Sequence, residues 1–363
     1  MTLYLGIALC LFGLAFLRLS GAIDARYERG LALCLTILAF VASVVRWETG
    51  TDWENYTGYF HYLTSLERVA SQTWWGPGYA YPAFLVQSLG GNYSVFLLLI
   101  AMILFPAKFV FLTRTSAAPL VAIFVLFCID FYDVFFVRET VAIIFFWGFV
   151  YYYFNNSRSA ALICAAAALT FHVSAALPLG VTVFFGRFQW RKAVWMTLAC
   201  AGLLYIAITF IDYGNTILVK MVGNYIEGDW VEVKTSSLST TVRAYIKLSF
   251  LVGVIAAAYA SFARARDDEQ ETDLAWRRFC LRCATGIIMA AALLLPLSEI
   301  FARVPNYAAP LLAIVLSGYR FRLRPLSVAG TAYLVILLML FVQLGFFYSS
   351  YADEFYPFKT ILY

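Results

Sequence analysis

Long apolar runs constrain the fold of this chain more than any other feature. They approach the roughly 20 residues that a helix needs to cross a bilayer. The clearest are Leu3 to Leu17, Gly30 to Val45, Val95 to Leu112, Ala193 to Ile211 and Val328 to Phe347. Only 13% of the residues are charged and 63% are hydrophobic, a balance that would give a water-soluble domain large exposed apolar patches. We therefore predict an all-α fold, a polytopic membrane helix bundle with about ten crossings.

Arginines gather in the short segments between the apolar runs. They are Arg18, Arg26, Arg29, Arg114 and Arg158, followed by clusters within 187–192, 264–282 and 320–324. Because basic loops stay in the cytoplasm, we place all of them inside, including the loop at about 263–280. The external loops then fall at about 46–92 and 212–241, within one integral membrane domain that covers residues 1–363.

The segment 160–186 does not fit a single crossing, because arginines flank it at both ends. We predict a broken or re-entrant pair of half-helices there, with the break near Thr170 to Ser174 and His172 at its tip. A similar short hairpin is expected for Tyr79 to Gly91, which is apolar but too short to cross.

A charged and aromatic segment, Arg46 to Tyr56, follows the second apolar run and reads R-W-E-T-G-T-D-W-E-N-Y. Such a segment at a membrane surface favours a site for a polar substrate over a simple anchor. Asp52 lies between two tryptophans, and partial desolvation there would raise its pKa as a general base requires. In the alternative interpretation, Thr49 to Asp52 caps an interfacial helix that begins near Trp53.

Three further polar residues lie in apolar surroundings. A buried charge is costly, so Arg138 either pairs with a nearby carboxylate such as Glu139 or faces a cavity and holds an anion. Arg303 poses the same alternative, with Glu299 four residues earlier on the same helical face. His172 is either hydrogen-bonded in the core or serves as a proton carrier or a hydrogen-bond donor to phosphate.

Several classes of site are not indicated. The net charge of +5 comes from arginines in orienting loops, so nucleic-acid binding is not expected. No H-x-x-x-H and no ligand-like carboxylate cluster is present, and Cys280 and Cys283 form a C-x-x-C without a second pair, so we predict no metal. No phosphate-binding loop, dinucleotide fingerprint or G-x-S-x-G nucleophile occurs, and we expect no cofactor.

Six short motifs follow one another along nearly the whole chain: G-T-D-W-E-N-Y, W-G-P-G-Y-A-Y-P, R-E-T, F-H-V-S-A, A-R-V-P-N-Y and the terminal Y-P-F-K-T. Their order and spacing resemble the EpsG branch of the Wzy-type bacterial polysaccharide polymerases. Where that family typically has an acidic residue before its G-Y motif, this chain has Gly76 and Pro77.

The resemblance implies a membrane-embedded glycosyltransferase of the GT-C type in the bacterial inner membrane. Such an enzyme transfers a glycan from undecaprenyl diphosphate to a hydroxyl of another lipid-linked repeat unit at the periplasmic or outer face. Its partners would be undecaprenyl-diphosphate-linked glycans, membrane lipid, and other polysaccharide assembly proteins such as a flippase and a chain-length regulator.

A diphosphate leaving group needs cations, and bidentate guanidinium groups bind phosphate oxygens well. We therefore assign diphosphate binding to Arg46, Arg138 and Arg303. Asp52 and His172 are the expected catalytic residues. The candidates for sugar binding are Trp53, Tyr56, Tyr79 and Asn306.

Other functions remain open. Broken helices and buried arginines also occur in transporters, so a flippase for lipid-linked oligosaccharides is one alternative, although no inverted repeat is seen. A single buried histidine also suits a membrane O-acyltransferase, but that enzyme needs a cytoplasmic acyl-CoA entry. An O-antigen ligase would be expected to have a larger basic external loop than 212–241.

Overall fold

The computed structural model describes residues 2–49, 53–71, 76–135, 138–187, 238–262, 271–295, 301, 303–318, 335–345 and 359–360. Within these residues the fold is helical, as predicted. The helices are α1 (Thr2–Leu19), α2 (Ala25–Val45), α3 (Trp53–Tyr62), α4 (Leu66–Ser71), α5 (Pro77–Ser88), α6 (Tyr93–Thr115), α7 (Pro119–Asp130), α8 (Arg138–Phe154), α9 (Arg158–Phe171), α10 (Ala176–Arg187), α13 (Leu238–Phe262), α14 (Glu271–Leu294) and α15 (Ala309–Ser317). Three 3-10 turns are η2 (Phe131–Asp133), η3 (Val173–Ala175) and η5 (Val304–Ala308).

One feature was not predicted, a pair of two-residue strands. β1 (Arg46–Trp47) pairs antiparallel with β2 (Lys359–Thr360). The pair joins the start of the charged and aromatic segment after α2 to the terminal Y-P-F-K-T motif, so two distant parts of the sequence meet at one place.

Local sequence signals explain where the main helices begin. The Asp24 side chain accepts a hydrogen bond from Arg26 N at the start of α2, and the Asn92 side chain accepts one from Val95 N at the start of α6. Both are standard N-caps. Helix α7 instead begins with Pro119, and every one of its residues is buried. A helix that is apolar on all sides belongs in the core, and α7 lies there against α1, α2 and α15.

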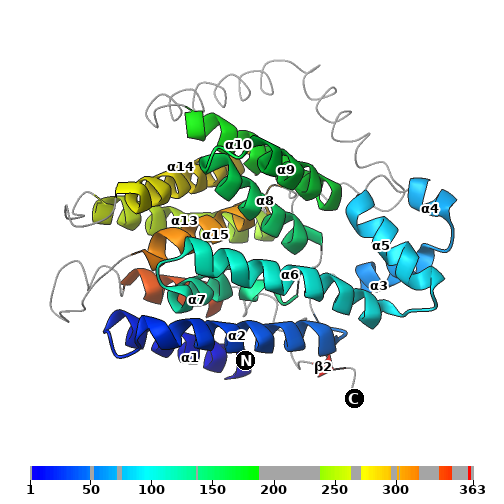
Figure 1. The fold of residues 1–363 in the computed structure, drawn as a ribbon, viewed down its shortest axis with the longest axis horizontal. Helices are drawn as coiled ribbons and strands as arrows, with labels where there is room; N and C mark the ends of the chain where they lie inside the picture. The colour runs from blue at the N-terminus through cyan, green and yellow to red at the C-terminus, as the bar shows by residue number, and fades with distance from the viewer. Residues whose placement is uncertain are drawn as a thin grey trace.

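Helices α1 and α6 end, and helices α2, α9 and α14 begin, at one end of the bundle (Figure 1, left). These helix ends carry described arginines such as Arg18, Arg114, Arg158 and Arg277, and we call this end the arginine end. Arg18 Nε, at the end of α1, contacts Glu28 Oε2 at 2.5 Å, and Glu28 Oε1 accepts a hydrogen bond from Leu120 N at the start of α7. Arg277 NH1, near the start of α14, donates to Gly318 O just after α15. These contacts are consistent with the sequence-based placement of the arginines on one side.

The helical path breaks at His172, inside the range predicted from the sequence. Helix α9 ends at Phe171, and α10 begins after η3. Helix α10 then runs back toward the arginine end. Its Gly186 lies against Tyr153 near the end of α8 and Phe279 near the start of α14, since a Cβ added to Gly186 would be 2.9 Å from both rings. Both outer ends of this half-helix pair are thus at the arginine end.

The expectation of a hairpin over Tyr79 to Gly91 was wrong. One continuous helix, α5, covers most of this segment, even though it contains Pro82. The reversal comes after α5 rather than within it, at Gly90, which has a φ of +79°. Glycine adopts this conformation without steric cost, so the turn forms there.

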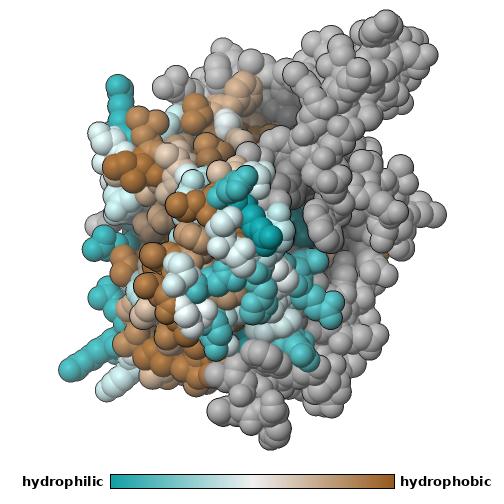
Figure 2. Space-filling model, turned by 90° about the vertical axis from the view of Figure 1, so that its right-hand side faces the viewer, coloured by the Kyte–Doolittle hydropathy of each residue, from teal (hydrophilic) through white to brown (hydrophobic). Residues whose placement is uncertain are grey.

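The surface of the bundle fits a membrane protein. Helices α2 and α6 are each long and apolar enough to cross a membrane, whereas the total of about ten crossings remains a prediction. Large apolar side chains also stay exposed, such as Leu38 at 64% on α2 and Leu162 at 69% on α9. Figure 2 looks onto the end opposite the arginine end, where hydrophilic side chains gather centrally and hydrophobic ones lie beside them.

Candidate functional site

His172 lies at the end of the bundle opposite the arginine end, which we call the histidine end. Its Nδ1 accepts a hydrogen bond from Ser174 N at 3.2 Å and lies 2.6 Å from Ser174 Oγ. Ser174 Oγ is in turn 3.1 Å from Tyr307 OH. Because a backbone N–H can only donate, Nδ1 is an acceptor, and the proton of the neutral ring is on Nε2.

Burial and two positive charges keep this imidazole neutral. Burial lowers the pKa of His172 from its ordinary value of 6.5 to about 3, and the nearby charges of Arg138 and Arg303 contribute to the decrease. His172 is in the turn between two half-helices and so lies outside α2 and α6, the two described helices long enough to cross a membrane. A ring that stays neutral near pH 7 fits a hydrogen-bond donor better than a proton carrier. Hydrogen bonds place the three residues in one region, because η5, which follows Arg303, contacts Ser174 beside His172 through Tyr307 and Glu139 beside Arg138 through Asn306.

Arg138 occupies the first position of α8, and the loop before it is held by α2. Ser43 Oγ donates to Val134 O at 3.1 Å, and Arg46 NH1 donates to Phe135 O. Tyr132, earlier in this loop, has a φ of +54°, an uncommon conformation for a bulky residue. The loop is therefore strained but fixed at several points, which sets the position of Arg138.

Arg46, in strand β1, and Arg138, at the start of α8, face one aromatic cluster. The Cζ of Arg46 lies 5.7 Å from the centre of the Trp53 ring, and the Cζ of Arg138 lies 5.9 Å from that of Tyr56. Both distances are within the range of cation–π attraction. Arg46 is nevertheless only 3% exposed, and its guanidinium bonds a backbone carbonyl. The geometry of Arg46 thus indicates that it stabilises the loop.

The aromatic residues expected to bind sugar pack mainly on other aromatic rings. Tyr79 is 0% exposed, and its ring centre lies 5.5 Å from Tyr56 and 4.9 Å from Phe96. Trp53 packs edge-on against Tyr93 at 5.1 Å. Since protein covers these rings, they form a wall behind the arginines.

Two glycines bring α5 against the turn that holds His172. Gly76 has a φ of +76°, and a Cβ added there would lie 2.5 Å from Thr170 O. A Cβ at Gly78 would lie 2.8 Å from Thr170 Oγ1 and 2.9 Å from the Phe171 ring. Real Cβ atoms do not approach so closely, so this contact requires glycine. It accounts physically for Gly76 at the position where the resemblance implies an acidic residue.

A second polar network lies next to Arg138. Asn306 Nδ2 donates to Glu139 Oε1 at 3.1 Å, and Lys247 Nζ donates to Asn306 Oδ1 at 2.6 Å. Glu139 and Asn306 are buried at 3% and 7% exposure. The Asn306 amide is thus held on both sides and lies one residue from Tyr307 of the His172 network.

The predicted residues therefore fall into distinct groups. The structure brings Arg138, His172 and Arg303 into one region, with Arg303 exposed at its edge. Asp52 and Glu299 lie outside the described residues. Two guanidinium groups and a neutral N–H donor can together bind an anion with several oxygens. The described residues contain no cluster of potential metal ligands.

Sequence reasoning did not single out Ser174, Tyr307 or Lys247. Ser174 and Tyr307 stood in the motifs F-H-V-S-A and A-R-V-P-N-Y, but hydroxyl groups are common in membrane helices and give no strong signal. Lys247 lies within an apolar helical stretch, Ile246 to Ala256. A lone cation in such a stretch is costly, so this residue could have been found from the sequence.

Comparison with protein families gives one match. The model described as the EpsG family matches residues 30–360, a range that includes all the site residues above. Comparison with curated proteins and with solved structures finds no match for the chain.

Proposed function

This chain belongs to the EpsG family, and we propose that it polymerises repeat units carried on undecaprenyl diphosphate at the outer face of the bacterial inner membrane. The family is one of polysaccharide polymerases, so the coarse activity follows from membership. The donor, the face and the residue roles are our proposals. The observation that supports them is the meeting of three segments: η5, which follows Arg303, hydrogen-bonds to Ser174 beside His172 and to Glu139 beside Arg138.

The orientation of the site follows from the two ends of the bundle. The described arginines at the helix ends, such as Arg18, Arg158 and Arg277, lie opposite His172, and basic segments of this kind stay in the cytoplasm. The histidine end then faces the periplasm or exterior. A site on this face needs its lipid-linked substrate delivered there, so a flippase is the partner that this orientation requires. A chain-length regulator is the second partner that we propose.

The reaction requires a departing negative charge to be stabilised. An acceptor hydroxyl oxygen forms a bond to the anomeric carbon, and the bond from that carbon to the diphosphate breaks with its electron pair on the phosphate oxygen. Arg138 and Arg303 bind the diphosphate oxygens, and His172 donates from Nε2. Hydrogen-bond donors that are already positioned to stabilise the negative charge of the transition state usually make the largest catalytic contribution.

The remaining residues have supporting or untested roles. Asp52 is our choice for the base that accepts the hydroxyl proton. Arg46 holds the loop that leads to Arg138 through its bond to Phe135 O. Asn306 is held by hydrogen bonds to Glu139 and Lys247. It thereby positions the η5 turn, which contains Tyr307 and directly follows Arg303.

The proposal is tested with purified protein in liposomes that contain lipid-linked repeat units. The wild type should produce a ladder of lengthened glycans on a gel. Arg138→Ala should reduce the initial rate by at least about 100-fold, as expected for the loss of a charged donor. Arg158→Ala is the matched control, because Arg158 is exposed at the start of α9 on the arginine end.

Two outcomes would contradict the proposal. Equal rates for Arg138→Ala and Arg158→Ala would remove Arg138 from the mechanism. A wild-type protein that moves lipid-linked units between leaflets without lengthening them would be a flippase.

A further inference from the structure

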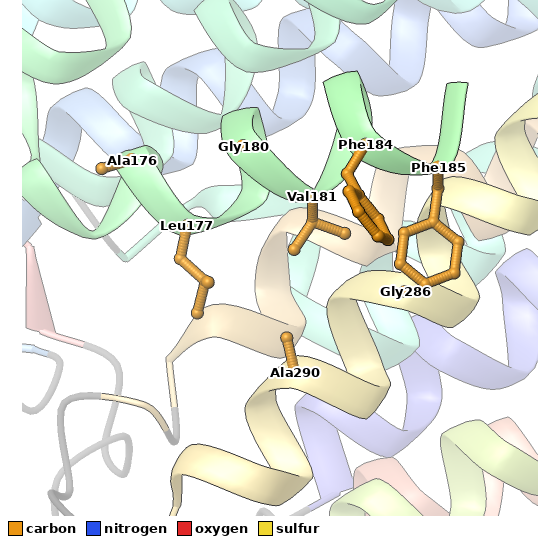
Figure 3. Close-up of a pocket in the computed structure, with 8 residues that line it drawn as sticks. All are labelled: Ala176, Leu177, Gly180, Val181, Phe184, Phe185, Gly286 and Ala290. Carbon is orange, nitrogen blue, oxygen red and sulfur yellow. The ribbon is translucent and has the colours of Figure 1, made fainter. Parts of the chain in front are cut away.

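A groove lies between α10 and α14 (Figure 3). It begins at Ala176, the first residue of α10 and the fourth after His172. Its volume is about 270 Å³. It is lined by Leu177, Val181, Phe184 and Phe185 on α10 and by Gly286 and Ala290 on α14. No residue that lines it is charged or polar. The groove therefore offers an apolar surface that starts where the cationic site ends.

The groove runs along α10 from the His172 turn toward the arginine end. Its lining residues on α10 extend from Ala176, two residues after Ser174, to Phe185. At 1.5 Å per residue this stretch covers roughly 14 Å, which is close to half of the roughly 30 Å hydrocarbon thickness. A ligand with its head at Arg138 and Arg303 would thus have the first part of its tail along α10, directed from the histidine end toward the arginine end.

Two glycines shape the groove. A Cβ added to Gly286 would lie 2.7 Å from the Phe185 ring and 2.8 Å from Val181, so glycine allows the helices to approach here. A Cβ added to Gly180 would meet no atom within 4 Å. A side chain at position 180 would therefore extend into the empty space of the groove.

We propose that this groove binds the first isoprene units of the polyprenyl chain while the diphosphate lies at the Arg138 and Arg303 site. The inference rests on the proposed function and adds a binding site for the polyprenyl chain, the part of the substrate that the proposed function does not place. A cavity of about 270 Å³ is small beside pockets of about 300–1,000 Å³ that enclose whole ligands. It therefore holds only the segment next to the headgroup, and the remainder of the chain lies in lipid.

Gly180→Leu tests the proposal, because its side chain would fill the groove without a clash. Binding of a photoreactive long-chain polyprenyl diphosphate to the purified protein should weaken about tenfold, equal to about 1.4 kcal/mol. Binding of inorganic diphosphate should not change, because the cationic site is intact. Gly13→Leu on α1 is the matched control, since a Cβ there also meets no atom within 4 Å.

Other results would overturn the proposal. Unchanged affinity of Gly180→Leu for the polyprenyl probe, or crosslinks that map away from α10 and α14, would do so. If bulk phospholipid protected the groove from crosslinking as well as unlabelled polyprenyl diphosphate does, the groove would be assigned to ordinary acyl chains. If the wild type formed a dimer that Gly180→Leu lost, the groove would be assigned to a second copy of the chain. Gly180→Ala serves if the leucine variant does not fold, with a smaller loss expected.

The polymerase proposal can fail separately. If wild-type protein binds the polyprenyl probe in the groove yet forms no glycan ladder, the groove assignment stands and the proposed reaction does not. If the ladder forms equally well with Gly180→Leu and polyprenyl affinity is unchanged, the reaction stands and the groove assignment is wrong.

Discussion

At His172 the local backbone decides which ring nitrogen can reach a substrate. Ser174 N donates to Nδ1, so only Nε2 can offer a proton. The sequence alone left three roles open: a hydrogen-bonded core residue, a proton carrier and a hydrogen-bond donor to phosphate. It could not separate them, because the separation depends on the turn after α9 and on the positions of Arg138 and Arg303.

The neutral state of His172 leads to a prediction about pH. Its pKa in the folded protein is lowered from 6.5 to about 3, so the ring is already neutral between pH 5.5 and 8. The polymerisation rate should therefore show no inflection from His172 in that interval. The same shift lowers the free energy of unfolding as the pH falls from 6.5 toward 3, because the unfolded chain binds the proton first.

Two substitutions of His172 separate the roles of its nitrogens. His172→Gln places an amide N–H near the position of Nε2 and should retain most of the rate. His172→Asn keeps an acceptor for Ser174 N but has no donor at the distal position, so its rate should fall about 100-fold. Rates of glycan lengthening measured from pH 5.5 to 8 check this. An inflection near pH 6.5 in the wild type that disappears in His172→Gln would show that the ring carries protons.

At the scale of elements, the break between α9 and α10 was predictable and the contact of α5 was not. The break follows from arginines at both ends of an apolar segment, which a membrane places on the same side. The approach of Gly76 to Thr170 depends on how two distant helices meet. Nothing local in W-G-P-G-Y indicates its partner, and the same holds for the β1–β2 pair.

Gly76→Ala tests that contact. The variant needs a positive φ and would put Cβ 2.5 Å from Thr170 O, so we expect the protein to lose about 2 kcal/mol or more of stability and much of its activity. Gly90→Ala is the control, because Gly90 has a φ of +79° but a Cβ there meets no atom within 4 Å. Thermal unfolding in detergent measures both. Equal losses of stability would show that backbone strain alone, and not the contact with α9, explains the glycine.

For the whole molecule, the distribution of charged residues along the chain predicted more of the architecture than local motifs could. Arg138 and Arg303 stood out as costly charges beside apolar runs, and the structure brings them together with His172. The arginine-rich loops gave the polarity of the bundle. The aromatic residues were less predictable, because a ring in a membrane protein can face sugar, lipid or another ring, and Tyr56 and Tyr79 face other rings.

The polarity of the bundle gives a last prediction. In a background without the seven native cysteines, Arg158→Cys and Arg187→Cys should both react with an impermeant maleimide only from the cytoplasmic side. Val173→Cys should react only from the outside, since Val173 is 39% exposed in the turn beside His172. Right-side-out and inverted vesicles provide the two exposures. Labelling of positions 158 and 187 from opposite sides would make this segment a true crossing. The histidine end would then lose its assignment to the outer face, because that assignment requires all the arginine loops to lie inside.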